Sequence, residues 1–199
     1  MDASAVDWLS RWCGERRNCG RPVSITIDTL DNPGWSLKVE LGADESSDVP
    51  HSTTASTSNP HDWTAIRLES GRFEGFGGPL SLGALLAALG RLSVATAVGP
   101  PGPELSWLMN WYAAQCDGDW EHDSGVRIVT LDAGGWQLEA DSSTKCYFTG
   151  SASTSTMRAS ETDWMVIDAH RDKFRARGGE RNLAAMIRAL ASGVAEQRG

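Results

Sequence analysis

The feature that most constrains the fold of this 199-residue chain is an internal repeat. The run of residues 29–35 returns as residues 130–136, and both copies begin with Thr-Leu-Asp and end with Gly-Trp. The same spacing of 101 residues carries Trp63 onto Trp164. A repeat of this kind indicates one folding unit used twice, so the fold is predicted for a unit of about 90 residues and then doubled.

Each unit is predicted to begin and end with a helix. In the first unit, Trp8 and Trp12 share one helical face, and a leucine-rich run follows Ser81, a residue type that caps helix N-termini well. Between these helices, residues 23–27 and 35–41 alternate between apolar and polar side chains, which is typical of half-buried strands. The second unit repeats the same patterns in the same order.

A tight turn is predicted between these two strands. In Asn32-Pro33-Gly34, proline fixes φ at one turn position and glycine supplies the positive φ needed at the next. The turn and its flanking strands predict a β-hairpin in each unit. The predicted fold class is therefore α+β, as a tandem duplication in which each unit is an antiparallel sheet with an N-terminal and a C-terminal helix.

The repeat also predicts the domain boundaries. Residues 1–95 form the first unit, residues 96–104 a Pro- and Gly-rich linker, and residues 105–199 the second unit. The prolines make this linker a stiff spacer, and the matching apolar faces permit an intramolecular pseudo-dimer. Two segments differ between the copies: the Ser- and Thr-rich residues 42–61 are predicted to be a mobile loop, and residues 145–149 an extra strand.

Composition excludes several classes of function. The net charge is −8, which disfavours nucleic acid as a partner, because binding phosphates requires a basic surface. No run of 18 apolar residues is present, so no membrane span is expected, and the acidic start does not resemble a signal peptide. A cytoplasmic location is therefore expected. The four cysteines form no CxxC pair and do not match between the copies, which argues against a shared disulfide or zinc site.

Upstream of the turns the spacing of the repeat is 99, because Trp8 and Trp12 return as Trp107 and Trp111. The second unit therefore holds two extra residues between Trp111 and Thr130, and an acidic segment lies there, whereas the first unit is basic in the same region. The charged and aromatic residues of this segment are Asp117, Asp119, Trp120, Glu121, His122 and Asp123. One hypothesis is a protein-binding patch, because carboxylates steer a basic partner and tryptophan is enriched at binding hot spots. The structural alternative is a solvated loop in which Asp117 or Asp119 caps backbone N–H groups.

Two chemical hypotheses for the same segment have less support. Asp117, Asp119 and Glu121 imitate the first ligands of an EF-hand calcium loop, but His122 replaces the required glycine and Ile128 the required glutamate. Acid–base catalysis by Glu121 or Asp119 with His122 has no accompanying nucleophile, phosphate-binding loop or metal motif. The sequence therefore predicts no catalytic residue, no metal ligand and no cofactor.

Eight of the nine tryptophans fall into four equivalent pairs, a pattern typical of core anchors. Trp35 and Trp136 lie directly beside the turns, so a binding role stays open for them. Asp31 and Asp132 lie in the same two turns as these tryptophans.

The motifs of the second unit occur in a characteristic order. They are Trp107-Leu108, Trp111-Tyr112, the acidic run 116–122, Gly125-Val126, Leu131-Asp132, Gly135-Trp136 and Asp163-Trp164. In this order they resemble the immunity protein 53 family of bacterial polymorphic toxin systems, over residues 104–193. The first unit is similar over residues 5–93 but degenerate, because it lacks the acidic run.

The resemblance implies a non-enzymatic protein that binds and neutralises a cognate toxin, or another basic protein or peptide, in the cytoplasm. The residues expected to bind this partner are Asp31, Trp35, Asp117, Asp119, Trp120, Glu121, His122, Asp132 and Trp136. A rival interpretation is an accessory or modifying protein of a peptide or natural-product biosynthetic cluster, built on an immunity-like fold. A third is a structural adaptor in which the two units present one composite face.

Overall fold

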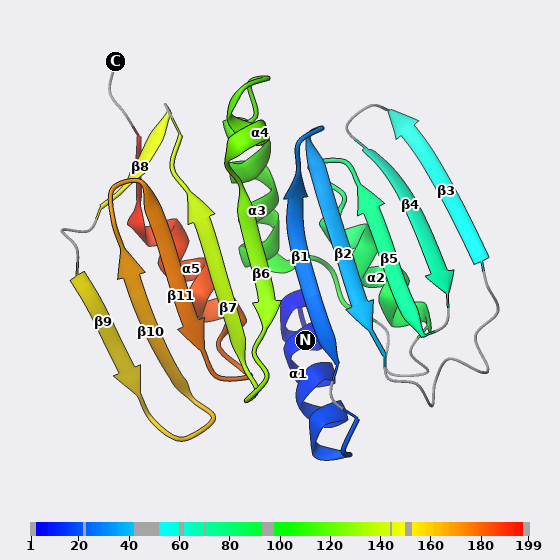
Figure 1. Ribbon diagram of the computed structural model, residues 1–199, viewed down its shortest axis with the longest axis horizontal. Helices are drawn as coiled ribbons and strands as arrows, with labels where there is room; N and C mark the ends of the chain where they lie inside the picture. Colours follow the sequence, from blue (N-terminus) through cyan, green and yellow to red (C-terminus); the bar gives the residue numbers. More distant parts are fainter. Residues whose placement is uncertain are drawn as a thin grey trace.

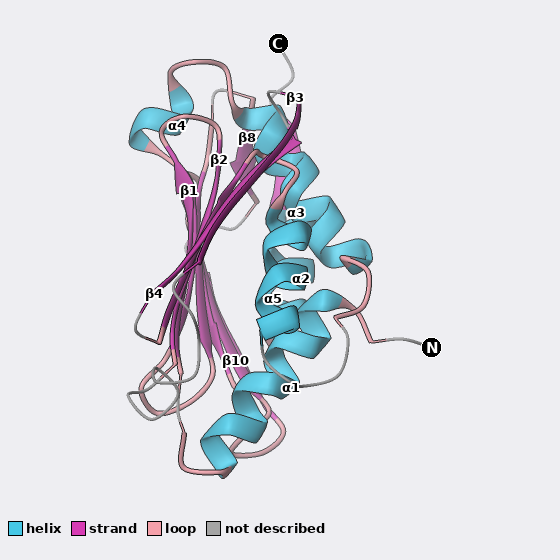
Figure 2. Ribbon diagram, turned by 90° about the vertical axis from the view of Figure 1, so that its right-hand side faces the viewer, coloured by secondary structure: helices cyan, strands magenta, loops and turns pink. Residues whose placement is uncertain are grey.

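The computed structural model describes residues 3–21, 23–41, 52–59, 62–69, 71–92, 98–143, 145–149 and 153–196. Within these residues the chain forms two layers, a ten-stranded antiparallel sheet and a layer of helices that covers one of its faces (Figures 1 and 2). The predicted α+β class is confirmed, with an N-terminal and a C-terminal helix in each unit.

The two units share seven elements that occur in the same order, and the second unit has further ones. The first unit contains α1 (Ala5–Asn18), β1 (Ser24–Leu30), β2 (Gly34–Glu40), β3 (Ser52–Asn59), β4 (Asp62–Glu69), β5 (Arg72–Gly77) and α2 (Leu82–Leu92). The second contains α3 (Gly102–Gln115), α4 (Trp120–Asp123), β6 (Val126–Thr130), β7 (Trp136–Asp141), β8 (Cys146–Phe148), β9 (Ser153–Arg158), β10 (Trp164–Ala169), β11 (Lys173–Gly178), α5 (Leu183–Gly193) and β12 (Val194–Glu196). Among the described residues, α4 and the small β8–β12 sheet have no counterpart in the first unit.

The large sheet runs continuously through both units. Its strand order, β3-β4-β5-β2-β1-β6-β7-β11-β10-β9, is the order of the first unit followed by its reverse in the second. At the centre, β1 pairs antiparallel with β6, and Ile27 lies opposite Ile128, its own counterpart in the repeat. A pseudo-two-fold axis therefore passes through this pair of residues, as at the interface of a symmetric dimer.

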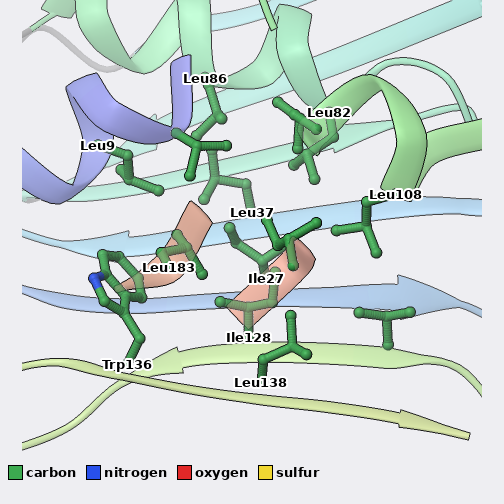
Figure 3. Packing of buried hydrophobic residues seen from close by; sticks show 14 of the residues in the cluster. Leu9, Ile27, Leu37, Leu82, Leu86, Leu108, Ile128, Trp136, Leu138 and Leu183 are labelled. Atoms are coloured by element: carbon green, nitrogen blue, oxygen red, sulfur yellow. The ribbon is translucent and has the colours of Figure 1, made fainter. Parts of the chain in front are cut away.

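One hydrophobic core lies between the sheet and the helices and contains residues of both units. Alternate strand residues point toward the helices because successive side chains of a strand face opposite ways. Figure 3 shows this packing around the central strands, with Leu9, Ile27, Leu37, Leu82, Leu86, Leu108, Ile128, Trp136, Leu138 and Leu183 labelled. The opposite face of the sheet is not covered by the long helices (Figure 2).

Some segments differ from the prediction. Residues 52–59, which were predicted as part of a mobile loop, form the edge strand β3 paired with β4. Serine and threonine tolerate an edge position, and threonine favours strands because it is β-branched. The other residues of that predicted loop, 42–51 and 60–61, lie outside the described residues. The extra strand predicted near residue 146 is confirmed as β8.

Helix α3 begins at Gly102, inside the span predicted as the linker. Pro103 is in its first turn, where the absent N–H of proline costs no helical hydrogen bond. Among the described residues, no helix is both long and apolar enough to cross a membrane.

Candidate functional site

The acidic segment forms a loop and the short helix α4, beside the end of the sheet where β1 and β2 meet (Figure 1). Its own carboxylates organise it. Asp117 Oδ1 accepts hydrogen bonds from the backbone N–H groups of Asp119 (3.2 Å) and Trp120 (3.1 Å). The Glu121 carboxylate accepts from the N–H groups of Asp117 and Gly118, both at 3.0 Å. The role of Asp117 is therefore the capping role given by the structural alternative.

These hydrogen bonds stabilise the charged forms of both carboxylates. The N–H groups of Trp120 and Asp119 hold the pKa of Asp117 below its usual value. For Glu121, desolvation acts to raise the pKa, but hydrogen bonds from its own backbone N–H and those of Asp117 and Gly118 outweigh it, and the pKa is lowered. Glu121 is only 5% exposed, so this side chain shapes the loop from inside.

A lysine from the extra strand region balances part of this charge. Lys145 Nζ donates to Ala114 O (2.9 Å) and Gln115 O (3.1 Å) at the C-terminus of α3, and it lies 3.7 Å from Asp117 Oδ2. A cation at a helix C-terminus is favourable because it meets unpaired carbonyl groups there. The acidic segment therefore has a basic neighbour that is distant in sequence, which local charge patterns do not reveal.

Trp120 anchors the acidic loop to the core. It is 9% exposed, its Nε1 donates to Ser142 O at 2.6 Å, and its ring lies 6.2 Å from that of Trp111 and 6.1 Å from that of Tyr112. Its lack of a partner in the first unit follows from its position in α4, which has no described counterpart there. Trp120 therefore holds the loop against the core, and little of its side chain is exposed for contact with a partner.

The turn tryptophans also lie inside the protein. Trp35 Nε1 donates to Pro79 O at 2.8 Å, and Trp136 Nε1 donates to Glu180 O at 3.0 Å, so the two units use the same bond. Both side chains are buried under their hairpins. The turns themselves lie at opposite ends of the sheet, because β1 and β6 are antiparallel. The exposed side chains of Asp31 and Asp132 therefore do not belong to one surface.

A groove of about 410 Å³ lies where the acidic loop meets the β1–β2 hairpin. It is formed by both units, since β1 and its turn supply one wall while α4, β6, β7 and β11 supply the rest. Among the described residues, six carboxylates line it against two permanent cations. The charged and titratable residues of the lining are Asp28, Asp31, Glu121, His122, Asp123, Arg127, Glu139, Asp141 and Lys173.

The cations of the groove are already paired across neighbouring strands. Arg127 of β6 lies 3.0 Å from Asp28 of β1, and this ion pair crosses the junction between the units. Lys173 lies 3.3 Å from Asp141 and 3.7 Å from Glu139. Cross-strand pairs of opposite charge stabilise a sheet. Burial raises the pKa of Asp28 by more than the nearby Arg127 lowers it.

The carboxylates at the rim differ from those on the floor. Asp31 and Asp123 are exposed, and neither forms an ion pair with any described residue. His122 is exposed beside them. The groove therefore combines a floor of compensated charges with an uncompensated acidic rim, which favours contact with an incoming cation.

Of the residues predicted to bind a partner, the structure brings Asp31, Glu121 and His122 together in this groove. Asp117 and Asp119 are exposed on the adjoining loop, while Asp132 lies at the far end of the sheet. The sequence prediction missed the groove residues Asp28, Glu139, Arg127, Asp141 and Lys173, and it named Asp123 only as part of the acidic segment.

One signal for the missed strand residues was present in the sequence. Asp28 and Glu139 each adjoin a core residue and so point to the opposite face of the sheet. That signal becomes useful only when the pairing of β1 with β6 is known. Among the described residues, no three His, Cys, Asp or Glu side chains are arranged to hold a metal ion.

Comparisons with curated proteins and with solved structures find no match. The family model described as immunity protein 53 matches the chain twice, over residues 6–93 and 105–194. The two matches coincide with the two structural units, and the first unit is matched although it lacks the acidic run. Because the matches cover nearly the whole sequence, the chain belongs to the immunity protein 53 family.

Proposed function

We propose that this protein binds a cognate bacterial toxin in the cytoplasm of the producing cell and neutralises it by direct contact. Membership of the immunity protein 53 family supports the class of function. The observation that carries the proposal is the groove built by both units, with an acidic rim at Asp31 and Asp123. An open, charged concavity of this kind fits a protruding basic segment of a partner protein.

The charges of the groove contribute to binding in two ways, by long-range attraction and by direct contact. The acidic excess attracts a basic partner over a distance and raises the rate of encounter. Once docked, a lysine or arginine of the toxin contacts the rim carboxylates of Asp31 and Asp123. Asp119 and Asp117 extend the acidic surface along the loop. Trp120, Glu121 and Trp35 act indirectly, by holding the acidic loop and the β1–β2 hairpin in place. Trp136 supports the other hairpin, at the far end of the sheet.

Binding is favoured over catalysis by the chemistry of the acidic loop. Glu121 has a lowered pKa and is engaged by backbone N–H groups, whereas a general acid near neutral pH needs a raised pKa. Immunity families are also generally non-catalytic, so the proposal treats His122 and its neighbours as contact residues.

The proposal is tested by expressing candidate toxin domains, taken from the genes that neighbour the gene for this chain, in a bacterial host with and without the chain. The parent chain is expected to restore growth with one of these domains and to bind an inactive form of it in calorimetry. Asp31→Asn combined with Asp123→Asn is expected to weaken binding by about tenfold or more, because both uncompensated rim charges are lost.

The pseudo-symmetry supplies a matched control, Asp132→Asn, which changes the equivalent turn at the far end of the sheet. This variant is expected to bind like the parent chain. If the parent chain neither bound any of these domains nor restored growth, the proposed function would be rejected. If the rim variant and the control bound equally well, the function would stand but the groove would not be its site.

A further inference from the structure

Tyr112 connects the two walls of the groove although it lies in the core. It belongs to α3 of the second unit and is fully buried. Its hydroxyl reaches the β1–β2 hairpin of the first unit, and its ring packs beside Trp120, which begins α4. One side chain therefore contacts both the hairpin that carries Asp31 and the first residue of α4, the helix that carries Asp123.

The hydroxyl of Tyr112 lies at the closing pair of the hairpin. It accepts a hydrogen bond from the N–H of Gly34 at 3.0 Å and donates to the carbonyl of Leu30 at 3.2 Å. Leu30 and Gly34 are register partners at the ends of β1 and β2, and Asp31 follows directly. A hydroxyl both donates and accepts, so it satisfies both backbone groups, which phenylalanine cannot do.

The ring of Tyr112 makes the second connection. Its centroid lies 4.9 Å from that of Trp35, at the start of β2, and 6.1 Å from that of Trp120. Tilted aromatic contacts at these distances are favourable and restrict the rings. Trp120 in turn supplies a backbone N–H to the carboxylate of Asp117, which shapes the acidic loop. Adjoining side chains therefore form a continuous path of contacts from the acidic loop to the hairpin.

The equivalent position in the first unit is built differently. Cys13 occupies the place of Tyr112, and Arg17 caps the other hairpin instead, donating to Leu131 O (3.2 Å) and Asp132 O (3.1 Å). Arg17 also pairs with Glu180 at 3.1 Å. Each hairpin is therefore capped by the first helix of the other unit, but the tyrosine lies only at the end of the sheet that bears the groove.

We propose that Tyr112 is a positioning residue that couples the acidic loop to the Asp31 hairpin, so that the two walls of the groove open and close together. The meaning of this coupling for binding rests on the proposed function of the groove. The coupling itself is a property of the free protein and is tested without a partner, so its failure is distinguishable from failure of the proposed function.

The test is residue-resolved amide hydrogen exchange on the full chain, comparing the parent with Tyr112→Phe. The exchange rate of the Gly34 amide is expected to rise by about tenfold or more, because its acceptor is removed. The amides of Gly118 and Trp120 in the acidic loop are expected to exchange several-fold faster as well. Leu105→Val, in the first turns of the same helix, is the control for loss of core packing.

A double-mutant cycle separates coupling from ordinary core packing. Asp117→Ala loosens the acidic loop by removing the acceptor of the Trp120 amide. It is expected to raise exchange at Gly34 when Tyr112 is present, and to have little further effect in the Tyr112→Phe background. Additive effects at Gly34 would overturn the proposal, as would a uniform rise in exchange that Leu105→Val reproduces.

Discussion

At the scale of single residues, the acidic segment shows that a carboxylate that is conspicuous in the sequence can serve to shape its own loop. Glu121 and Asp117 accept hydrogen bonds from backbone N–H groups of their own loop. Asp31 and Asp123, by contrast, have no described ionic partner and remain directed at solvent. Glu121 therefore shapes the site from inside, Asp31 and Asp123 are available to a partner, and the exposed Asp117 does both.

This division predicts a specific pH dependence for Glu121. Its pKa is lowered in the folded protein, so the charged carboxylate contributes stability that is present above the unfolded value of 4.5. That contribution is lost as the pH falls from there through the folded pKa. Glu121→Gln is expected to lower the free energy of unfolding by about 1–2 kcal/mol at pH 7. Urea denaturation at pH 7 and at acid pH measures the difference, which is expected to shrink at acid pH.

A constant difference between parent and variant across that pH range would show that the charge of Glu121 does not stabilise the loop. Asp123→Asn is the matched control on the same helix, since its side chain is exposed and makes no described ion pair. It is expected to leave the free energy of unfolding at pH 7 nearly unchanged.

At the scale of elements, periodicity in the sequence was sufficient to predict the four long helices and the first two strands of each unit. Trp8 and Trp12 are four residues apart because this spacing places them on one face of a helix, and residues 35–41 alternate because successive strand residues face opposite sides. Both patterns arise within a single element, so they can be recognised without knowledge of tertiary contacts. The edge strand β3 lacks apolar alternation and was predicted as a loop. Its strand form depends on pairing with β4, which is a tertiary contact.

The groove was only partly predictable for the same reason. Its walls come from β1 and from residues about 100 positions later, and only the pairing of β1 with β6 joins them. The sequence identified Asp31 and the acidic run separately. It also left a surface role open for Trp35 and Trp136, because turns are usually exposed, whereas both are the first inward-facing residues of their strands.

Two glycines with positive φ, one in the β6–β7 hairpin and one in the acidic loop, are predicted to differ in how much stability is lost on substitution by alanine. Gly135 has φ 102°, and an added Cβ would lie 2.2 Å from Gly178 O, a backbone atom of the neighbouring strand. Gly118 has φ 99°, but nothing lies within 4 Å of its added Cβ. Gly118→Ala is therefore expected to cost only backbone strain, about 1–3 kcal/mol. Gly135→Ala adds a clash that the paired strands cannot relieve, and is expected to cost more.

Guanidinium denaturation of the two variants measures this difference directly. Equal costs would mean that the β7–β11 pairing shifts to accommodate a side chain. In that case the close approach of the Gly135 hairpin to β11 would not constrain the fold.

At the scale of the whole molecule, the pseudo-symmetry relates the backbones of the two units but not the charges of their side chains. The floor residues Asp28 and Glu139 have Val129 and Lys38 as their counterparts, so these two acidic charges are not repeated at the far end of the sheet. The duplicated scaffold therefore bears different charges at its two ends, and the acidic groove lies at the end that carries α4. The first unit contributes a wall to this groove although it lacks the acidic run.

The shared sheet and core predict that the two units unfold together. Ile27 and Ile128 pair across the junction, Arg17 of the first unit caps the hairpin of the second, and Tyr112 does the converse. Separating the units would expose apolar surface and leave these backbone groups without their partners, so an intermediate with one folded unit is unfavourable.

Thermal unfolding followed by tryptophan fluorescence and by NMR signals assigned to each unit is expected to give one midpoint. Ile128→Ala, which leaves a cavity at the junction, is expected to lower that midpoint equally for both units, at a cost of about 2–5 kcal/mol. Two separate midpoints, or a shift confined to the second unit, would instead mean that the units are autonomous domains that share only a sheet edge.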